Sequence, residues 1–154
     1  MENLVGTDYI LEIDTDTPVA TNTRGTDADY RMIACLTTNG LEIAVATQDT
    51  TNKCSNGTTQ SVPGLLSWSF NGDGQAVSLT LSEEATKANF QELLSLAVSK
   101  TTFFMRMTNP TNSLVREGLV YISAYNETAG NAEPYTFTAT FTGSGEIFIT
   151  PETT

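Results

Sequence analysis

The chain has 154 residues, lacks histidine, and carries 18 Asp and Glu against 7 Lys and Arg, which gives a formal net charge of −11. This length suits one domain with a core of its own, so we expect residues 1–154 to form a single domain. The missing histidine removes the commonest general base and metal ligand. The negative charge disfavours a protein that grips nucleic acid by its phosphates. The 27 threonines favour strands.

Two further observations bear on the cellular compartment. No stretch approaches the roughly 20 apolar residues of a membrane span, and Met1–Leu4 begins acidic with no apolar run behind it, so we expect neither a membrane anchor nor a secretion signal. Cys35 lies in an apolar run and is expected to be a buried free thiol, whereas Cys54 lies in a polar loop. Two thiols without histidine make a poor metal site, and a reduced, cytoplasmic state is the simplest interpretation.

The first half of the chain alternates between short strands and long polar stretches. Strands are expected over 9–13, 31–37 and 41–47, and Asn39-Gly40 predicts a hairpin between the last two. The polar stretches 14–30 and 48–62 show no hydrophobic periodicity. Their length indicates functional loops or flexible arms.

The segment 61–74 contains the clearest strand signal. Three large apolar residues alternate with serines, which is the period of a strand with one buried face: Leu66, Trp68 and Phe70. Asn71–Gly74 contains residues that tolerate positive φ and is expected to turn the chain into a further strand over 75–81.

One helix is expected, over 83–99, with Ser82 as its N-cap. Its apolar residues recur at helical spacing and predict one buried face: Phe90, Leu93, Leu94 and Ala97. Strands follow over 101–107, which ends at Asn109-Pro110, and over 118–125.

The final hairpin has the most regular alternation. Phe137, Ala139 and Phe141 share one face of 135–142, and four threonines share the other. Gly143-Ser144-Gly145 is expected to turn the chain into a last strand over 146–150. Seven to nine strands with one helix predict a mainly β protein, a β-sandwich or partly open barrel with one packed α-helix. Four large residues mark its core: Trp68, Phe70, Phe137 and Phe141.

Catalytic and cofactor motifs are not found in the sequence. Without histidine there is no Ser-His-Asp or Cys-His pair, and neither a phosphate-binding glycine loop nor a dinucleotide fingerprint is present. Asn71–Gly74 lacks the further carboxylates of a calcium loop. Paired carboxylates for glycoside cleavage have no recognisable context. We therefore expect a protein that is not an enzyme and binds no metal or cofactor.

Taken in order, five segments resemble the major tail tube proteins of long-tailed bacteriophages. The most distinctive is Pro63–Phe70, a P-G-x-x-S-W strand before the acidic-glycine pair Asp73-Gly74. The other four are Gly6–Ile13, the pair Ile33–Thr38 and Leu41–Asp49, Gly118–Ser123 and Phe137–Gly145. The resemblance covers roughly residues 6–149. The loop 48–62 departs from the family pattern because it lacks a tryptophan that relatives often carry.

The resemblance implies a structural role. Members of that family form hexameric rings that stack into a hollow tube, and inner strands of neighbouring subunits join in a continuous barrel. The genome passes through the bore without specific binding. The implied partners are further copies of the chain, a tape-measure protein and tail-tip and terminator proteins, with no membrane. The implied location is the virion tail, after assembly in the host cytoplasm.

Physical reasoning adds candidate residues to that role. Inward acidic groups would repel a duplex within a Debye length of about 8 Å. The candidates for the bore are Glu42, Asp49 and Asp73, and the threonine face with Thr136, Thr138 and Thr140. An ordinary solvated sheet face explains either set equally well. The polar stretches are the candidate inter-subunit arms: Asp14, Asp16, Asp27 and Asp29 in the first, and Lys53 and Asn56 in the second.

Two alternatives stay open at this stage. The inner tube of a contractile tail or injection machine shares the fold, and a neighbouring sheath protein would distinguish it. A secreted carbohydrate-binding β-sandwich would use Trp68 and tyrosines as stacking platforms, which requires these rings to be exposed.

Overall fold

The computed structural model describes residues 4–20, 23–109 and 114–150. The bounds of its strands are Ile10–Asp14 (β1), Arg31–Ile33 (β2), Leu36–Asp49 (β3), Ser61–Gln75 (β4), Lys87–Ala88 (β5), Phe103–Asn109 (β6), Leu114–Thr128 (β7) and Thr136–Thr150 (β8). Its α-helices are Leu81–Glu84 (α1) and Phe90–Ser99 (α2), and short 3-10 turns lie at Gly6–Asp8 (η1) and Asp27–Asp29 (η2). The expected turn at Asn109-Pro110 falls partly outside the described residues.

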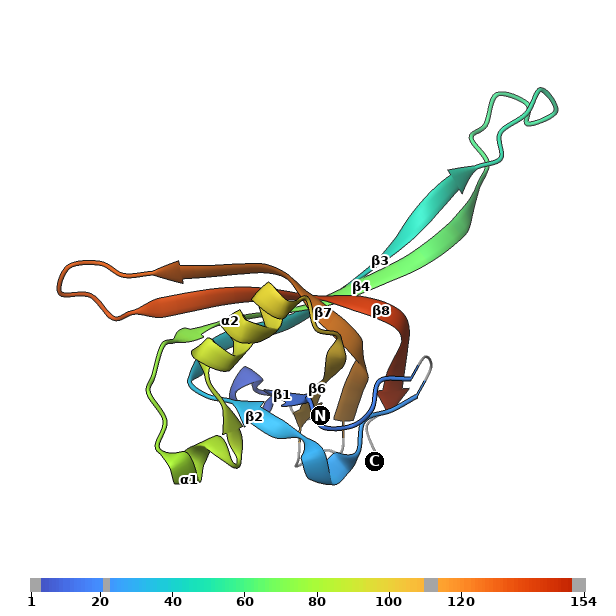
Figure 1. Cartoon of the computed structure of the whole chain (residues 1–154). Helices are drawn as coiled ribbons and strands as arrows, with labels where there is room; N and C mark the ends of the chain where they lie inside the picture. The colour runs from blue at the N-terminus through green and yellow to red at the C-terminus, as the bar shows by residue number, and fades with distance from the viewer. Residues whose placement is uncertain (1–3, 21–22, 110–113, 151–154) are drawn as a thin grey trace.

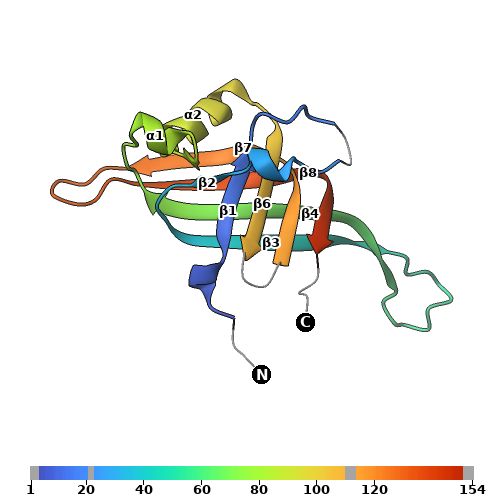
Figure 2. The same cartoon turned by 90° about the horizontal axis from the view of Figure 1, so that it is seen from below.

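The strands form one curled sheet. Across the described part of the chain, eight strands lie in the order β3-β4-β8-β7-β6-β1-β2-β5, and only β2 and β5 are parallel neighbours. The long strands β7 and β8 serve two halves of the sheet, because β6 pairs with the first half of β7 while β4 pairs with the first half of β8. Helix α2 packs against β7 (Figures 1 and 2). The predicted mainly β fold class is confirmed.

Two hairpins extend from the body in opposite directions (Figures 1 and 2). One is β3–β4, whose outer halves pair only with each other, since β4 meets β8 only over Ser69–Gln75. The other is the hairpin formed by the end of β7 and the start of β8. The outer half of the β3–β4 hairpin pairs with no other strand, whereas the start of β8 pairs with β4 as far as Thr136, and Phe90 of α2 contacts Tyr125 and Tyr135 of the second hairpin.

The bend of the sheet is filled by Trp68. Its side chain is 4 % exposed, and its Nε1 donates a hydrogen bond to the Gly145 carbonyl at 3.0 Å. Two glycines make room for the ring: a Cβ on Gly118 would lie 2.5 Å from its Cη2, and one on Gly143 would collide with its Cε2. Phe70 packs edge-on against the indole, with the ring centroids 5.6 Å apart. The bend therefore depends on the packing of the large Trp68 side chain against two residues that have no side chain.

The core lies between the two halves of the sheet. Phe137 and Phe141 of β8 are buried with Phe70, and Phe141 meets Phe103 of β6 edge-on at 6.3 Å between centroids. Leu93 is the buried residue of α2. The four residues named as core markers from sequence are thus all buried, each below 5 % exposure.

Two expected turns are wrong, and for one shared reason. Asn39-Gly40 lies within β3 and Asn71–Gly74 within β4, directly opposite each other in the same ladder. A Cβ on Gly74 would lie 2.8 Å from the Cys35 carbonyl oxygen and 2.9 Å from the Phe137 ring. The glycines therefore permit close packing in a paired strand, whereas the sequence pattern of small and turn-forming residues predicts reversals.

The glycine turn expected at Gly143-Ser144-Gly145 is also wrong. β8 runs through it to Thr150, and Gly145 takes a φ of +96° inside the strand. The expected strand over 75–81 is absent, since β4 ends at Gln75 and residues 76–80 are irregular. Reversals occur instead at 50–60 and 129–135, where polar residues are not opposed by any partner strand.

The expected helix over 83–99 is two helices separated by β5. Asn89 caps α2 by accepting a hydrogen bond from the Glu92 N–H at 2.9 Å, which starts the helix later than a Ser82 cap would. α1 begins at Leu81 and is capped by Thr80, whose N–H and hydroxyl both donate to the Glu83 carboxylate. The break lets Lys87–Ala88 pair with β2. Leu94, expected on the buried face, is 39 % exposed.

Cys35 is exposed rather than buried, contrary to the expectation from its apolar neighbours. The chain reverses between β2 and β3 at this residue, which takes a φ of +55°. Ala34 and Ile33 beside it remain buried. Cys54 is also a free, exposed thiol.

Replacing Gly143 with Ala is expected to destabilise the fold by about 1–3 kcal/mol, because the added methyl group overlaps the Trp68 ring. Denaturant unfolding followed by fluorescence measures the change. Gly6→Ala is the matched control, since its Cβ meets nothing within 4 Å, and should stay within about 0.5 kcal/mol. Equal effects of the two substitutions would contradict the packing described for the bend.

Candidate functional site

One face of the β3-β4-β8 part of the sheet is polar. Cross-strand pairs place Glu42 beside Ser69, and Ser69 beside Thr142. Farther along, Asp73 pairs with Thr138 in the same alternation. The predicted acidic face and the predicted threonine face are therefore one continuous surface, the polar sheet face, which holds Glu42, Asp73, Thr136, Thr138 and Thr140.

The strands that carry this face are purely acidic. β3, β4 and β8 contain four carboxylates and no Lys or Arg: Glu42, Asp49, Asp73 and Glu146. Asp73 accepts a hydrogen bond from the Thr38 hydroxyl at 2.9 Å. Asp49 lies at the outer end of β3, and hydrogen bonds from Thr51 lower the pKa of its carboxyl. The three strands therefore present negative charge with no compensating base in their own sequence.

The opposite face of the projecting β3–β4 hairpin is apolar. Ile43 pairs with Trp68 and Val45 with Leu66, so these side chains share the face that is buried farther in. Ile43 is 44 % exposed, and Val45 and Leu66 are each 51 % exposed. The expectation that Leu66 lies buried beside Trp68 and Phe70 is wrong, because the hairpin runs past the edge of the core. We call Ile43, Val45 and Leu66 the apolar stripe.

The hairpin ends in an ordered loop, 50–60. The Thr50 N–H donates to the Gln60 carbonyl at 2.9 Å and closes the loop. Inside it, the Asn52 N–H donates to the Ser55 hydroxyl at 3.0 Å, and Asn56 takes a φ of +48°. Lys53 is the only base between the start of β3 and the end of β4. The predicted arm 48–62 therefore consists of the outer ends of β3 and β4 and the hydrogen-bonded loop that joins them.

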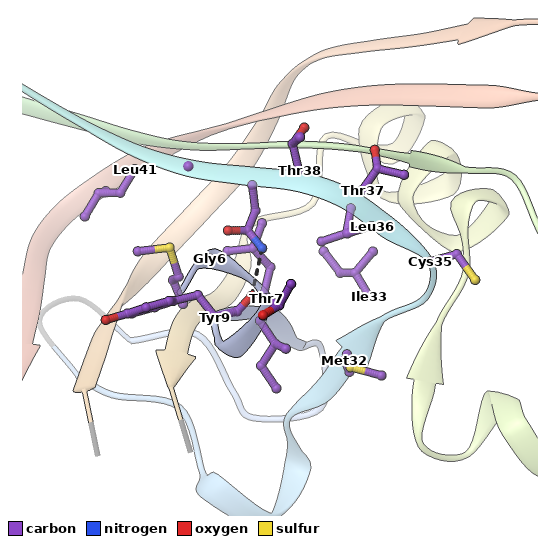
Figure 3. Close-up of a pocket in the computed structure, with 15 residues that line it drawn as sticks. Gly6, Thr7, Tyr9, Met32, Ile33, Cys35, Leu36, Thr37, Thr38 and Leu41 are labelled. Carbon is purple, nitrogen blue, oxygen red and sulfur yellow. Dashed lines mark hydrogen bonds between the residues drawn. The ribbon is translucent and has the colours of Figure 1, made fainter. Parts of the chain in front are cut away.

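A cavity of about 790 Å³ opens between β3 and β1 (Figure 3). Tyr9, Met32, Leu36 and Leu41 are drawn around it. Asn39 also lines the cavity, and its side-chain amide donates a hydrogen bond to the Tyr9 carbonyl at 3.1 Å. Every residue that lines the cavity is uncharged. The uncharged lining contrasts with the acidic polar sheet face.

The predicted arm 14–30 begins at the buried residue Asp14. Its carboxylate accepts the N–H groups of Asp16, Thr17 and Thr26 at 3.0, 2.9 and 3.1 Å, and the Thr17 hydroxyl as well. Burial raises the pKa of this carboxyl, but the four hydrogen bonds together outweigh burial and leave the pKa below its ordinary value. The carboxylate therefore organises the turn that follows β1.

Ion pairs hold the rest of the described segment against the sheet. Arg24 pairs with the buried Glu117 of β7, and Arg106 of β6 pairs with Glu12 and Asp27. The Arg106 guanidinium also lies 4.1 Å from the centre of the Tyr30 ring. Asp29 receives only a long contact from the Thr17 hydroxyl, at 3.4 Å. In the isolated chain, these contacts fold the candidate arm back onto its own body.

The structure brings most predicted bore residues together and separates the predicted arms. Asp49, Lys53 and Asn56 lie at the outer end of the β3–β4 hairpin, and the aspartates of 14–30 lie near β1, β6 and η2. Sequence reasoning missed the apolar stripe and the cavity. The available signal was the aliphatic alternation of Leu41, Ile43 and Val45.

Within the described ranges, no group of three or more Cys, Asp or Glu residues is placed to hold a metal ion. In those same ranges, no helix has both the length and the hydropathy needed to cross a bilayer.

The fold matches solved structures of phage-like tails and a tail tube. No family model matches the sequence, and no curated protein matches it. The tail of an empty gene transfer agent particle, refined with C6 symmetry, matches with a TM-score of 0.73 at 14 % identity over 97 % of this chain and 100 % of that one. The SPP1 tail tube matches with 0.63 at 13 %, over 97 % and 80 %. A chain of the anti-feeding prophage baseplate matches with 0.61 at 8 %, over 97 % of each. The chain has the tail tube fold.

Asp14→Asn is expected to cost about 1–3 kcal/mol of folding free energy at pH 7, because a charged acceptor of four hydrogen bonds is lost. Since the pKa of Asp14 is lowered in the folded chain, its stabilisation is present above the ordinary Asp pKa of about 3.9 and is lost as the pH falls through the folded value. Urea unfolding between neutral pH and pH 3 should show the two proteins converging. Glu42→Gln, at an exposed position, is the control that should follow the parent chain. A constant gap at all pH values would contradict this role of Asp14.

Proposed function

We propose that this protein is the subunit of a tail tube, in which rings of six copies stack around a bore that DNA crosses. The observation that carries the proposal is the agreement of almost the whole chain with tail tube structures, one of them refined with C6 symmetry. The projecting β3–β4 hairpin supports it, because its outer half pairs with no other strand of its own chain (Figure 1). No catalytic role is assigned.

The bore is formed, in this proposal, by the polar sheet face. Its two acidic residues, Glu42 and Asp73, lie on strands that carry no base, so the face would repel phosphate and a duplex would slide without adhering. Threonine and serine hydroxyls complete a hydrated surface. The net charge of −11 per chain agrees with a wall that lets DNA pass without specific binding.

The partners follow from that role. Copies join within rings and between rings, a tape-measure protein occupies the bore during assembly, and tail-tip and terminator proteins close the ends. The tube is assembled in the host cytoplasm and resides in the virion. The loop 50–60 is the proposed contact between rings, and segment 14–30 is a second arm that is released from its own body when copies join.

A specific observation favours a second candidate, the inner tube of a contractile injection machine. The fold also matches a chain of the anti-feeding prophage baseplate, with a TM-score of 0.61. A sheath protein that binds the outer surface of the assembled tube would support it. The carbohydrate-binding alternative loses its Trp68 platform, because Trp68 is 4 % exposed and packs inside the bend.

Negative-stain electron microscopy of the purified protein at rising concentration tests the proposal directly. Rings or tubes of uniform diameter are the expected result, and averaged end views should have six-fold symmetry. A protein that stays monomeric at every concentration, and also when tube fragments are added as seeds, would refute it.

Glu42→Lys and Asp73→Lys are expected to leave tubes intact but slow DNA release from assembled particles, because inward lysines attract phosphate. Purified tubes of these variants should also retain duplex DNA at low salt and lose it as the salt rises. Glu84→Lys, the same charge change on α1, is the matched control and should release DNA at the parent rate. Unchanged release for Glu42, Asp49 and Asp73 variants alike would place the bore elsewhere.

Replacing residues 51–59 by an Asn-Gly turn is expected to give single rings that do not stack, because β3 and β4 stay paired while their tip is removed. Sedimentation and electron microscopy separate rings from tubes. Asn56→Gly keeps the loop length and its positive φ, so this control should stack normally. Tubes of ordinary length from the shortened chain would rule out the loop as the contact between rings.

A further inference from the structure

The apolar stripe and the cavity are both open surfaces without a partner in their own chain. The stripe faces away from the polar sheet face, on the outer half of a hairpin that no other element covers (Figures 1 and 2). The cavity lies beneath the inner half of β3, where Leu36 and Leu41 contribute to its wall (Figure 3). Leaving both exposed to water is unfavourable.

We propose that the stripe of one copy docks into the cavity of the neighbouring copy in the same ring. This contact rests on the tube function proposed above and assigns to it the surfaces through which subunits join. Ile43, Val45 and Leu66 are the inserted residues, and the receiving wall includes Leu36 and Leu41.

Charge selects a second copy as the occupant. The chain carries −11, so identical subunits repel wherever their acidic surfaces meet. All fifteen residues that line the cavity and all three of the stripe are uncharged. These are therefore surfaces through which copies can approach closely without bringing carboxylates together, and their apolar contact offsets the repulsion elsewhere.

Geometry supports the same occupant. The cavity and the stripe occupy successive stretches of one face of β3, since Leu41 lines the cavity and Ile43 and Val45 continue that face outward. In the proposed head-to-tail contact, each copy gives its hairpin to one neighbour and receives a hairpin from the other. A contact of this type repeats around an axis and closes into a ring when the rotation allows. An interface of two identical patches would stop at a dimer. The outer half of the β3–β4 hairpin extends away from the body (Figure 1).

Cross-linking tests the contact. Cys54→Ser leaves Cys35, an exposed thiol on the cavity lining, as the only cysteine. Adding Leu66→Cys to this background and treating assembled tubes with a short bis-maleimide should give a ladder of covalent multimers up to six copies. Ser67→Cys, the next residue on the opposite face of the same strand, is the matched control and should give no ladder.

Substitution provides an independent readout. Leu66→Lys should raise the critical concentration for assembly at least about tenfold, because a charge replaces buried apolar area. Ser67→Lys should leave it within about twofold. Both positions are solvent-exposed in the monomer, and equal melting temperatures of the two variants will establish that folding is not the cause.

The outcomes separate this contact from the tube function itself. Tubes that form but give no ladder with Leu66→Cys, or equal ladders from both positions, overturn the docking contact and leave the tube function standing. An apolar small molecule that remains in the cavity of assembled tubes, detected by native mass spectrometry, overturns it as well. Absence of any assembly by the parent chain refutes both.

Discussion

The fold depends on how Trp68 fills the bend of a single sheet. Its ring occupies the space left by Gly118 and Gly143, and its indole N–H is bonded to the Gly145 carbonyl. This packing sets the path of β7 and β8, which belong to both halves of the sheet. The same bend gives the two hairpins their directions. The core and the projecting surfaces thus share one steric origin.

Paired charges and unpaired acidic charges lie in different parts of the fold. The basic residues Arg24, Arg31 and Arg106 are paired with carboxylates on or around β1, β2, β6, β7 and α2, where they stabilise the body. The charged residues of β3, β4 and β8 are all Asp or Glu. A uniform spread of the same charges would give neither a repulsive wall nor an uncharged contact surface. The separation makes a strongly acidic chain compatible with self-association.

The strand alternation of the sequence predicted the fold class, the core aromatics and the polar sheet face, because side-chain period depends only on local backbone geometry. Turn positions were predicted poorly. Gly40 and Gly74 are turn-forming residues by local rules, yet both lie in paired strands, and the Cys35 carbonyl and the Phe137 ring leave no room for a side chain on Gly74. The exposure of Ile43 and the cavity under β3 depend on where long strands leave the core. That point is set by pairing between distant segments.

The alternation of side chains along β3 limits how the β3–β4 ribbon can change in length during evolution. Even-numbered residues such as Glu42 point to one side, and odd-numbered ones such as Ile43 to the other, so each side has its own chemistry. Inserting one residue would exchange the sides, placing aliphatic groups where carboxylates stood. Inserting two would lengthen the ribbon while each side kept its character. Related chains should therefore differ in ribbon length by even numbers, unless a bulge absorbs the odd residue.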